Sequence, residues 1–174
     1  MGQYAKAAYM AILFANDMKH VHLHSAGEDF DKIHNLAEDY YYRASSDSDY
    51  LCELAVENKE SVVNPTLALS AVGDEWIPET GEDYNYAACL EVIKAKLAKY
   101  LQELTELRRE TPYEDVKSKL DDMLRMWRKE LEYKTAKRSQ VNTSSFIKSD
   151  SDERTAQYAQ QHLQQKGDGL LSWD

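Results

Sequence analysis

The feature that most constrains the fold is a stretch of the chain, residues 28–58, that contains neither glycine nor proline. Its apolar residues recur at the spacing of one helix face: Phe30, Ile33, Ala37, Tyr41, Ala44, Leu51 and Ala55. A helix of this length is long for a globular domain. We therefore expect it to belong to a helix bundle or to an interface between subunits.

Three further segments repeat apolar residues with the same period. Together they give four expected helices: 4–24, 28–58, 84–109 and 112–138. The first is followed by a short break that ends in Gly27, a residue suited to the end of a helix. The last is predicted to begin with Thr111 as its N-cap and Pro112 at its first position. Its buried face is expected to hold Val116, Leu120, Met123, Trp127 and Leu131.

Residues 59–83 differ from the helical segments because they hold two of the three prolines and two of the six glycines. We expect a long crossover there, with one short helix near residues 65–71. Four long helices with a long connection only between the second and third form a ferritin-like four-helix bundle. We predict this all-α fold over residues 1–138, followed by a polar C-terminal extension with a short helix over residues 139–174. An unrelated four-helix bundle is the alternative.

The composition excludes several classes of protein. The formal net charge is −10, which disfavours non-specific binding to nucleic acid because phosphate backbones repel it. No apolar run approaches the ~20 residues that span a bilayer, and the first residues lack the basic region of a secretion signal. We therefore expect no membrane partner. Cys52 and Cys89 have no metal-type spacing, so we expect thiols in a reducing compartment, the cytoplasm.

Three histidines alternate in the sequence HVHLH, residues 20–24. On a helix, a step of two residues turns the side chain by about 200°. His20 and His24 therefore share one face, and His22 lies on another. The pair of His20 and His24 has the spacing to bind a transition metal, but we expect surface or pore-lining residues here.

The second expected helix carries a stripe of metal-ligand side chains. His34 and Glu38 are four residues apart, and so are Asp49 and Glu53. At about 100° per residue, all four fall within one arc of roughly 100°. Imidazole and carboxylate donors suit iron, manganese or zinc. The two pairs lie about 16 Å apart along the helix axis at ~1.5 Å per residue, so one chain cannot join them in a single site.

A second copy of the helix, antiparallel to the first, removes this separation. The midpoint between His34 and Glu53 falls at 43.5, and so does the midpoint between Glu38 and Asp49. One twofold axis at this point would set His34 against the partner's Glu53, and Glu38 against the partner's Asp49. The dimer would then hold two equivalent clusters. Three small residues near the axis would permit close approach: Ala44, Ser45 and Ser48.

The stretch from His22 to Glu53 resembles the Dps family, the mini-ferritins. In that family a histidine closes the first helix, a glycine and a phenylalanine follow in the loop, and a second histidine comes twelve residues after the first. A carboxylate lies four residues beyond the second histidine, an aspartate fifteen beyond it and a glutamate nineteen beyond it. The corresponding residues, each at the family's spacing, are His22, Gly27, Phe30, His34, Glu38, Asp49 and Glu53.

This resemblance implies that the chain is a ferroxidase. His22, His34 and Glu38 of one subunit, with the partner's Asp49 and Glu53, would bind iron. Hydrogen peroxide or dioxygen would oxidise the iron, protecting against oxidative damage. The resemblance also implies a homo-oligomer, a hollow dodecameric cage that stores the ferric mineral. Manganese and zinc are alternative metals.

The sequence departs from the family pattern beside these residues. Leu23 stands where the family usually has tryptophan, and Glu38 where it usually has aspartate. Many members bind DNA through lysine-rich tails, but the amino end here offers only Lys6, so we expect no strong DNA binding. The alternative function is a non-catalytic helical assembly or interaction protein on the same fold, with a vestigial or structural metal site.

Overall fold

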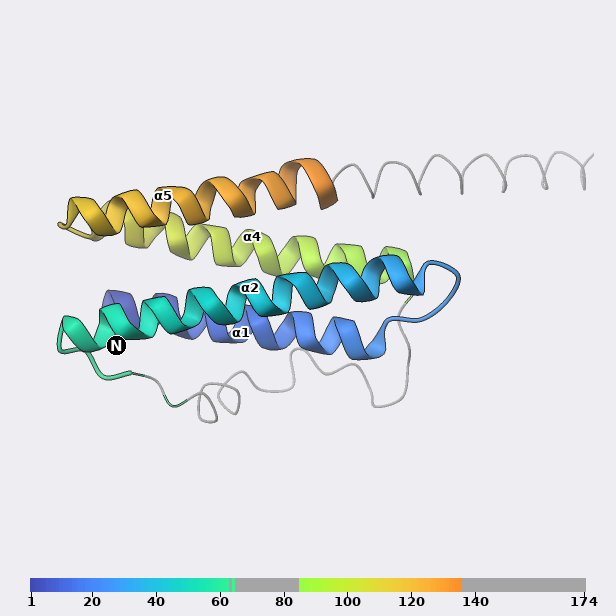
Figure 1. The fold of residues 1–174 in the computed structure, drawn as a ribbon, viewed down its shortest axis with the longest axis horizontal. Helices are drawn as coiled ribbons and strands as arrows, with labels where there is room; N and C mark the ends of the chain where they lie inside the picture. Colours follow the sequence, from blue (N-terminus) through green and yellow to red (C-terminus); the bar gives the residue numbers. More distant parts are fainter. Residues whose placement is uncertain (63, 65–84, 136–174) are drawn as a thin grey trace, which may run out of the picture. The chain divides into compact units, whose positions relative to one another are not determined.

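The computed structural model of the chain describes residues 1–62, 64 and 85–135, and these form four long helices (Figure 1). The helices are α1 (Gln3–His24), α2 (Phe30–Glu57), α4 (Tyr86–Glu110) and α5 (Glu114–Lys129), and a π-helical segment, η2 (Glu130–Thr135), continues α5. The predicted all-α class is confirmed, and the long connection does join the second helix to the third. The short helix predicted near residues 65–71, the domain boundary at 138 and the extension 139–174 lie outside the described residues.

α1 and α2 form an antiparallel pair that lies side by side along its length, and α4 and α5 form the second pair (Figure 1). α4 packs on α1 as well as on α5. The close approach of α1 to its neighbours follows from its small side chains, which include Ala7, Ala8 and Ala11, each at most 1% exposed. No helix in the described ranges is long and apolar enough to cross a membrane.

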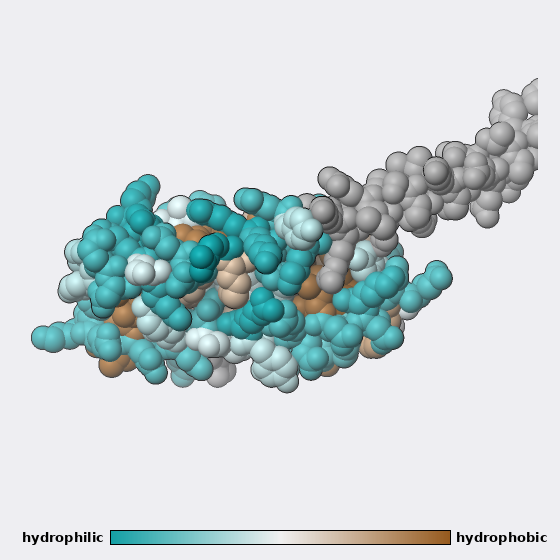
Figure 2. Space-filling model, turned by 45° about the horizontal axis from the view of Figure 1, so that its top comes forward, coloured by the Kyte–Doolittle hydropathy of each residue, from teal (hydrophilic) through white to brown (hydrophobic). Residues whose placement is uncertain are grey.

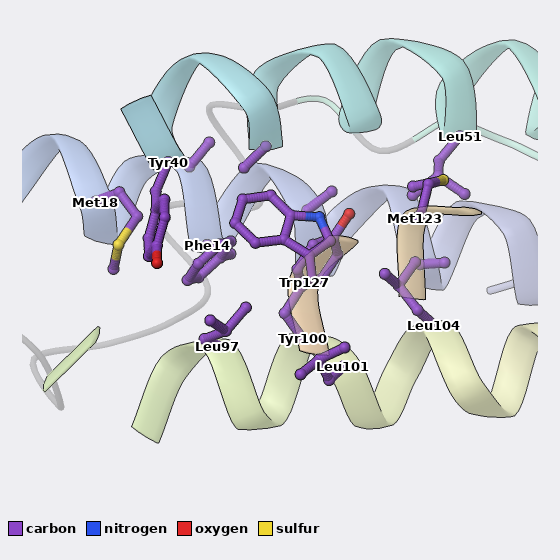
Figure 3. Packing of buried hydrophobic residues seen from close by; sticks show 14 of the residues in the cluster. Phe14, Met18, Tyr40, Leu51, Leu97, Tyr100, Leu101, Leu104, Met123 and Trp127 are labelled. Carbon is purple, nitrogen blue, oxygen red and sulfur yellow. The ribbon is translucent and has the colours of Figure 1, made fainter. Parts of the chain in front are cut away.

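An aromatic cluster fills the centre of the bundle (Figure 3). Trp127 of α5 is fully buried, as the sequence predicts, and contacts Phe14 of α1, Tyr40 of α2 and Tyr100 of α4. The ring centroids lie 5.4, 5.3 and 5.9 Å from that of Trp127, at the edge-to-face angles that aromatic rings prefer. One residue from each helix therefore meets at Trp127.

The inner tyrosine of α2 is Tyr40, not Tyr41 as the apolar pattern of the second helix predicts. Tyr40 is fully buried, Tyr41 is partly buried against the core, and Tyr42 is 62% exposed. A hydrogen bond of its hydroxyl group explains why Tyr40 can be buried. The Tyr40 hydroxyl donates a hydrogen bond to Glu130 at 2.9 Å, so this amphipathic side chain reaches a partner that an apolar residue would leave unsatisfied.

The predicted start of α5 is wrong. Thr111 caps the C-terminal end of α4 instead, and the N-cap of α5 is Tyr113. Thr111 has an extended backbone, as expected for a residue before proline, and its hydroxyl lies 2.7 Å from the hydroxyl of Tyr4. This contact with α1, 107 residues away, is buried and uses the hydroxyl that the prediction assigned to capping.

The π-helical turn η2 ends the bundle with a buried carboxylate. Glu130 accepts hydrogen bonds from Tyr40, from Arg43 at 3.2 Å and from Lys134 at 2.7 Å. Burial favours the neutral acid, but the hydrogen bonds from Lys134 and Tyr40 outweigh it, so the pKa of Glu130 lies below its ordinary value. α2 and η2 are thereby joined by an ionised group.

The outward face of α5 is polar. Figure 2 shows this side of the bundle as largely hydrophilic, with small apolar patches. The exposed residues of α5 are charged or polar at regular helical spacing, and Val116, Leu120, Leu124 and Trp127 face inward.

Candidate metal centre

His22 and His34, two of the predicted ligands, are in direct contact. His22 lies two residues before the end of α1 and His34 in the second turn of α2. Their rings stack with centroids 3.7 Å apart at 29°, and Phe30 packs on His34 at 4.7 Å. The loop between the helices makes this meeting achievable because Gly27 has φ +96°, a left-handed conformation that glycine adopts without strain.

The two histidines also hold each other's orientation. Nδ1 of His34 lies 2.9 Å from the carbonyl oxygen of His22, and Nδ1 of His22 lies 3.3 Å from the carbonyl oxygen of His34. A carbonyl oxygen accepts hydrogen bonds but cannot donate them, so each Nδ1 carries the proton. In the neutral imidazoles Nε2 then holds the lone pair. Metal-binding histidines are commonly oriented by such a backbone contact on the other ring nitrogen.

The remaining predicted ligands lie on α2. Glu38 is partly buried, and Asp49 and Glu53 are exposed. In the described part of the chain, neither Asp49 nor Glu53 makes a hydrogen bond or an ion pair. Both carboxylates are therefore directed to solvent in a single subunit and remain available to a cation or to a second chain.

Within the described residues, one subunit does not complete the predicted iron site. Among residues 1–62, 64 and 85–135, no three His, Cys, Asp or Glu side chains are close enough together to hold a metal ion. The two imidazoles meet at the start of α2, and the carboxylates of Asp49 and Glu53 lie about four and five turns further along this helix. These donors could meet only if another copy of the chain were to approach this helix.

The prediction about small residues at the twofold axis needs correction. Ala44 is fully buried and Ser48 is 8% exposed, so both belong to the interior of their own subunit. Ser45 remains partly accessible, and Tyr42 is 62% exposed. Numbers 42 and 45 are also symmetric about 43.5, so an antiparallel copy would set the large Tyr42 against the partner's small Ser45.

His20 and His24 lie on a different face of α1 from His22. Their rings contact each other with centroids 4.3 Å apart at 35°, as the shared helix face predicts. Burial, and then the neighbouring His24, place the pKa of His20 below its ordinary value. His162 and Trp76 lie outside the described residues.

The sequence patterns did not single out two partly buried acids of the bundle, Asp47 and Asp17. Asp47 accepts hydrogen bonds from the indole of Trp127 at 2.7 Å and from the hydroxyl of Tyr100 at 3.0 Å, and burial raises its pKa. Asp17 pairs with Lys96 at 3.3 Å, and burial raises its pKa to about 6. In the sequence, the only sign of these two sites is a single acidic residue at a position that shares the apolar face of its helix.

Comparison with known proteins agrees with the fold. No protein-family model matches the chain, and neither does a curated protein. Among solved structures, the antigen TpF1 from Treponema pallidum matches with a TM-score of 0.65 and 16% identity, covering 79% of this chain and 88% of that one. Dps from Listeria monocytogenes matches with a TM-score of 0.56 and 18% identity, covering 75% and 90%. A mutant of Listeria innocua Dps also scores 0.56, at 17% identity, covering 75% and 93%.

This chain has the fold of the Dps proteins. The predicted ferritin-like class is therefore confirmed. At these low identities the likeness concerns the fold, and it does not extend to the chemistry of the site. The fold likeness and the His22-to-Glu53 motif are separate observations, since one uses the backbone of four helices and the other uses side-chain spacing.

Proposed function

We propose that the chain is a Dps-like ferroxidase, which oxidises Fe²⁺ with hydrogen peroxide or dioxygen at a site shared by two subunits and stores the ferric product. The observation that carries the proposal is the fixed pair of His22 and His34, whose Nδ1 protons face carbonyl oxygens. The reducing cytoplasm fits the two thiols, Cys52 and Cys89, which form no disulfide.

The ligands suit iron as substrate. Neutral imidazole nitrogens bind Fe²⁺, and hard carboxylate oxygens favour the ferric state. In the proposed site, His22, His34 and Glu38 come from one subunit, and Asp49 and Glu53 come from the partner. Manganese or zinc would find the same donors, so the choice of iron is part of the proposal.

The geometry of α2 supports a shared site. The four ligands on this helix lie opposite its buried face, where Tyr40, Ala44 and Leu51 are fully buried. Two antiparallel copies can therefore meet through their ligand-bearing faces without disturbing either core. Tyr42, exposed near the twofold axis, would gain burial against the partner's Ser45. A dodecameric cage would place further contacts elsewhere on the subunit.

Iron oxidation tests the chemistry. Purified protein given Fe²⁺ and peroxide should develop ferric absorbance, and a variant with His34→Ala and Glu53→Ala should not. Glu57→Ala serves as a control, because Glu57 is also an exposed carboxylate near the end of α2 but lies outside the ligand set. Equal rates for the wild type and the double variant would overturn the enzymatic proposal.

Subunit mixing tests whether the site is shared. His34→Ala and Glu53→Ala subunits should each be inactive alone, because every site lacks one ligand. A mixed dimer holds one site with both defects and one intact site. Random assembly of equal amounts should therefore restore about a quarter of the wild-type sites. No recovery in mixed dimers would contradict the shared site.

Oligomer mass separates the alternatives. Light scattering distinguishes a dimer from a dodecameric cage. A stable oligomer without iron oxidation would favour the alternative function, a non-catalytic assembly protein with a vestigial or structural metal site.

A further inference from the structure

The last turns of α1 carry two histidine pairs that face different ways. His22 turns towards α2 and stacks on His34, whereas His20 and His24 stack on each other. The step of two residues separates His22 from both by about 200° around the helix. The second pair therefore lies outside the site proposed for iron oxidation, although it is only two residues away in sequence.

We propose that His20 and His24 form a second metal site, which binds a divalent transition metal of the Cu²⁺ and Zn²⁺ class. Imidazole suits these borderline cations and does not suit Mg²⁺ or Ca²⁺. Each neutral ring holds one nitrogen lone pair for the metal, while its other nitrogen stays able to donate a hydrogen bond. Spacing of i and i+4 on a helix brings both rings to one ion.

The position of the pair favours a cation. His24 is the last residue of α1, and His20 lies one turn before it. The C-terminal end of a helix carries a partial negative charge of about half an electron. Both residues are partly exposed, although Nε2 of His20 is itself buried. A metal held by both rings would clamp the last turn of α1.

Two protein ligands imply a site of moderate strength with a clear order of preference. Cu²⁺ should bind more tightly than Zn²⁺, following the general order of divalent metals for nitrogen donors. Loss of either imidazole breaks the chelate. Each single substitution should therefore weaken binding by about tenfold or more, at least as much as the loss of a group that merely orients a ligand.

The test uses the full chain with His34→Ala and Glu53→Ala, which removes the site proposed for iron. Equilibrium dialysis against Cu²⁺ alone and Zn²⁺ alone should show about one ion per chain. Adding His20→Asn and His24→Asn should abolish this binding. The matched control adds His162→Asn, which removes an imidazole elsewhere and should leave binding unchanged.

A second measurement guards against a variant that fails to fold. Zn²⁺ should raise the midpoint of thermal unfolding in the His34→Ala, Glu53→Ala chain, because the ion binds the folded helix. The single variant His24→Asn, at the helix end, should fold and lose this rise. Unchanged binding after loss of His20 and His24, or a rise of the same size in His24→Asn, would overturn the proposal.

The outcomes stay separate from those of the proposed ferroxidase. His20→Asn with His24→Asn, in an otherwise wild-type chain, should oxidise iron at the wild-type rate. If iron oxidation fails in every chain while Cu²⁺ still binds through His20 and His24, the ferroxidase proposal fails and the second site stands.

Discussion

The acidic residues on the two faces of α2 differ in whether they have hydrogen-bond partners within the subunit. Asp47, on the inner face, accepts hydrogen bonds from Trp127 and Tyr100 within its own subunit. Asp49, two residues later and about 200° around the helix, is exposed and makes no hydrogen bond or ion pair in the described part of the chain. One helix thus carries a carboxylate that serves the fold and another that the fold leaves unused.

The difference shows where stability and function lie in this chain. A buried carboxylate without partners costs several kcal/mol, so the inner acids Asp17, Asp47 and Glu130 all have hydrogen-bonding or charged partners. The exposed acids Asp49 and Glu53 carry no such constraint. In the proposed shared site, their spacing, opposite the inner face and symmetric about 43.5, would serve a partner subunit and a cation.

The largest effect is expected at Trp127, where all four helices meet. Trp127→Ala should lower the free energy of unfolding by ~3–5 kcal/mol, because it leaves a cavity among three aromatic rings and removes a donor to Asp47. Denaturant titration followed by circular dichroism measures the loss. Trp127→Phe, which keeps a ring, should lose less. A loss under ~1 kcal/mol for Trp127→Ala would contradict the claim that the aromatic cluster around Trp127 stabilises the bundle.

The comparison between Asp47 and Asp49 is the next test. Asp47→Ala should cost about 2–3 kcal/mol, because the buried indole and phenol donors lose their acceptor. Asp49→Ala should stay within ~0.5 kcal/mol, as surface substitutions generally do. Both variants are measured by urea unfolding under the same conditions. Equal losses would mean that the two faces do not differ as described.

Asp17 makes the folding stability of the chain depend on pH. Its pKa is about 6 in the folded chain, above the ordinary value of 3.8, so the folded chain binds the proton more tightly than the unfolded chain. Stability from this group is therefore fully present below the ordinary value and is lost as the pH rises through about 6. The loss is at most ~3 kcal/mol at 1.36 kcal/mol per pKa unit.

Asp17→Asn removes this dependence. Losing the ion pair with Lys96 changes the stability of the variant by a roughly constant amount. Between pH 4 and pH 7, the unfolding free energy of the variant should rise relative to that of the wild type. Urea titrations across this range measure it. Asp121→Asn is the control, because the hydrogen bond from Arg108 lowers the pKa of Asp121, so its contribution to stability changes mainly below the ordinary value of 3.8 and should stay nearly constant over this range. A flat difference for Asp17→Asn would contradict the buried pair.

A smaller loss than that at Trp127 or Asp47 is expected at Glu60, which lies just beyond α2 and binds the start of α1. Its carboxylate accepts a hydrogen bond from the backbone N–H of Ala5 at 2.8 Å, and a side chain at Gly2 would collide with it. Gly2, the N-cap of α1, provides no side-chain cap. Glu60→Ala should cost ~1 kcal/mol, as for a lost helix cap, and Glu60→Gln should cost less. Thermal unfolding monitored by circular dichroism distinguishes the two variants.

Much of the fold was predictable because helical periodicity is local. The four helices, the burial of Trp127 and the opposed faces of α2 all follow from spacing within one segment. Thr111 was misassigned because its hydroxyl contacts Tyr4, a residue on another helix. The apolar pattern predicts Tyr41 rather than Tyr40 as the inner tyrosine because the hydrogen-bond partner of Tyr40, Glu130, lies 90 residues away.

The candidate site divides in the same way. The sequence alone determined that His34, Glu38, Asp49 and Glu53 share one side of α2 and that His20 and His24 share one side of α1, since a residue's angle around a helix depends only on its number. The tertiary structure decided that His22 meets His34, that Ala44 faces inward and that Asp47 and Glu130 are held by partners. These outcomes depend on the approach of segments far apart in the chain, which no local pattern records.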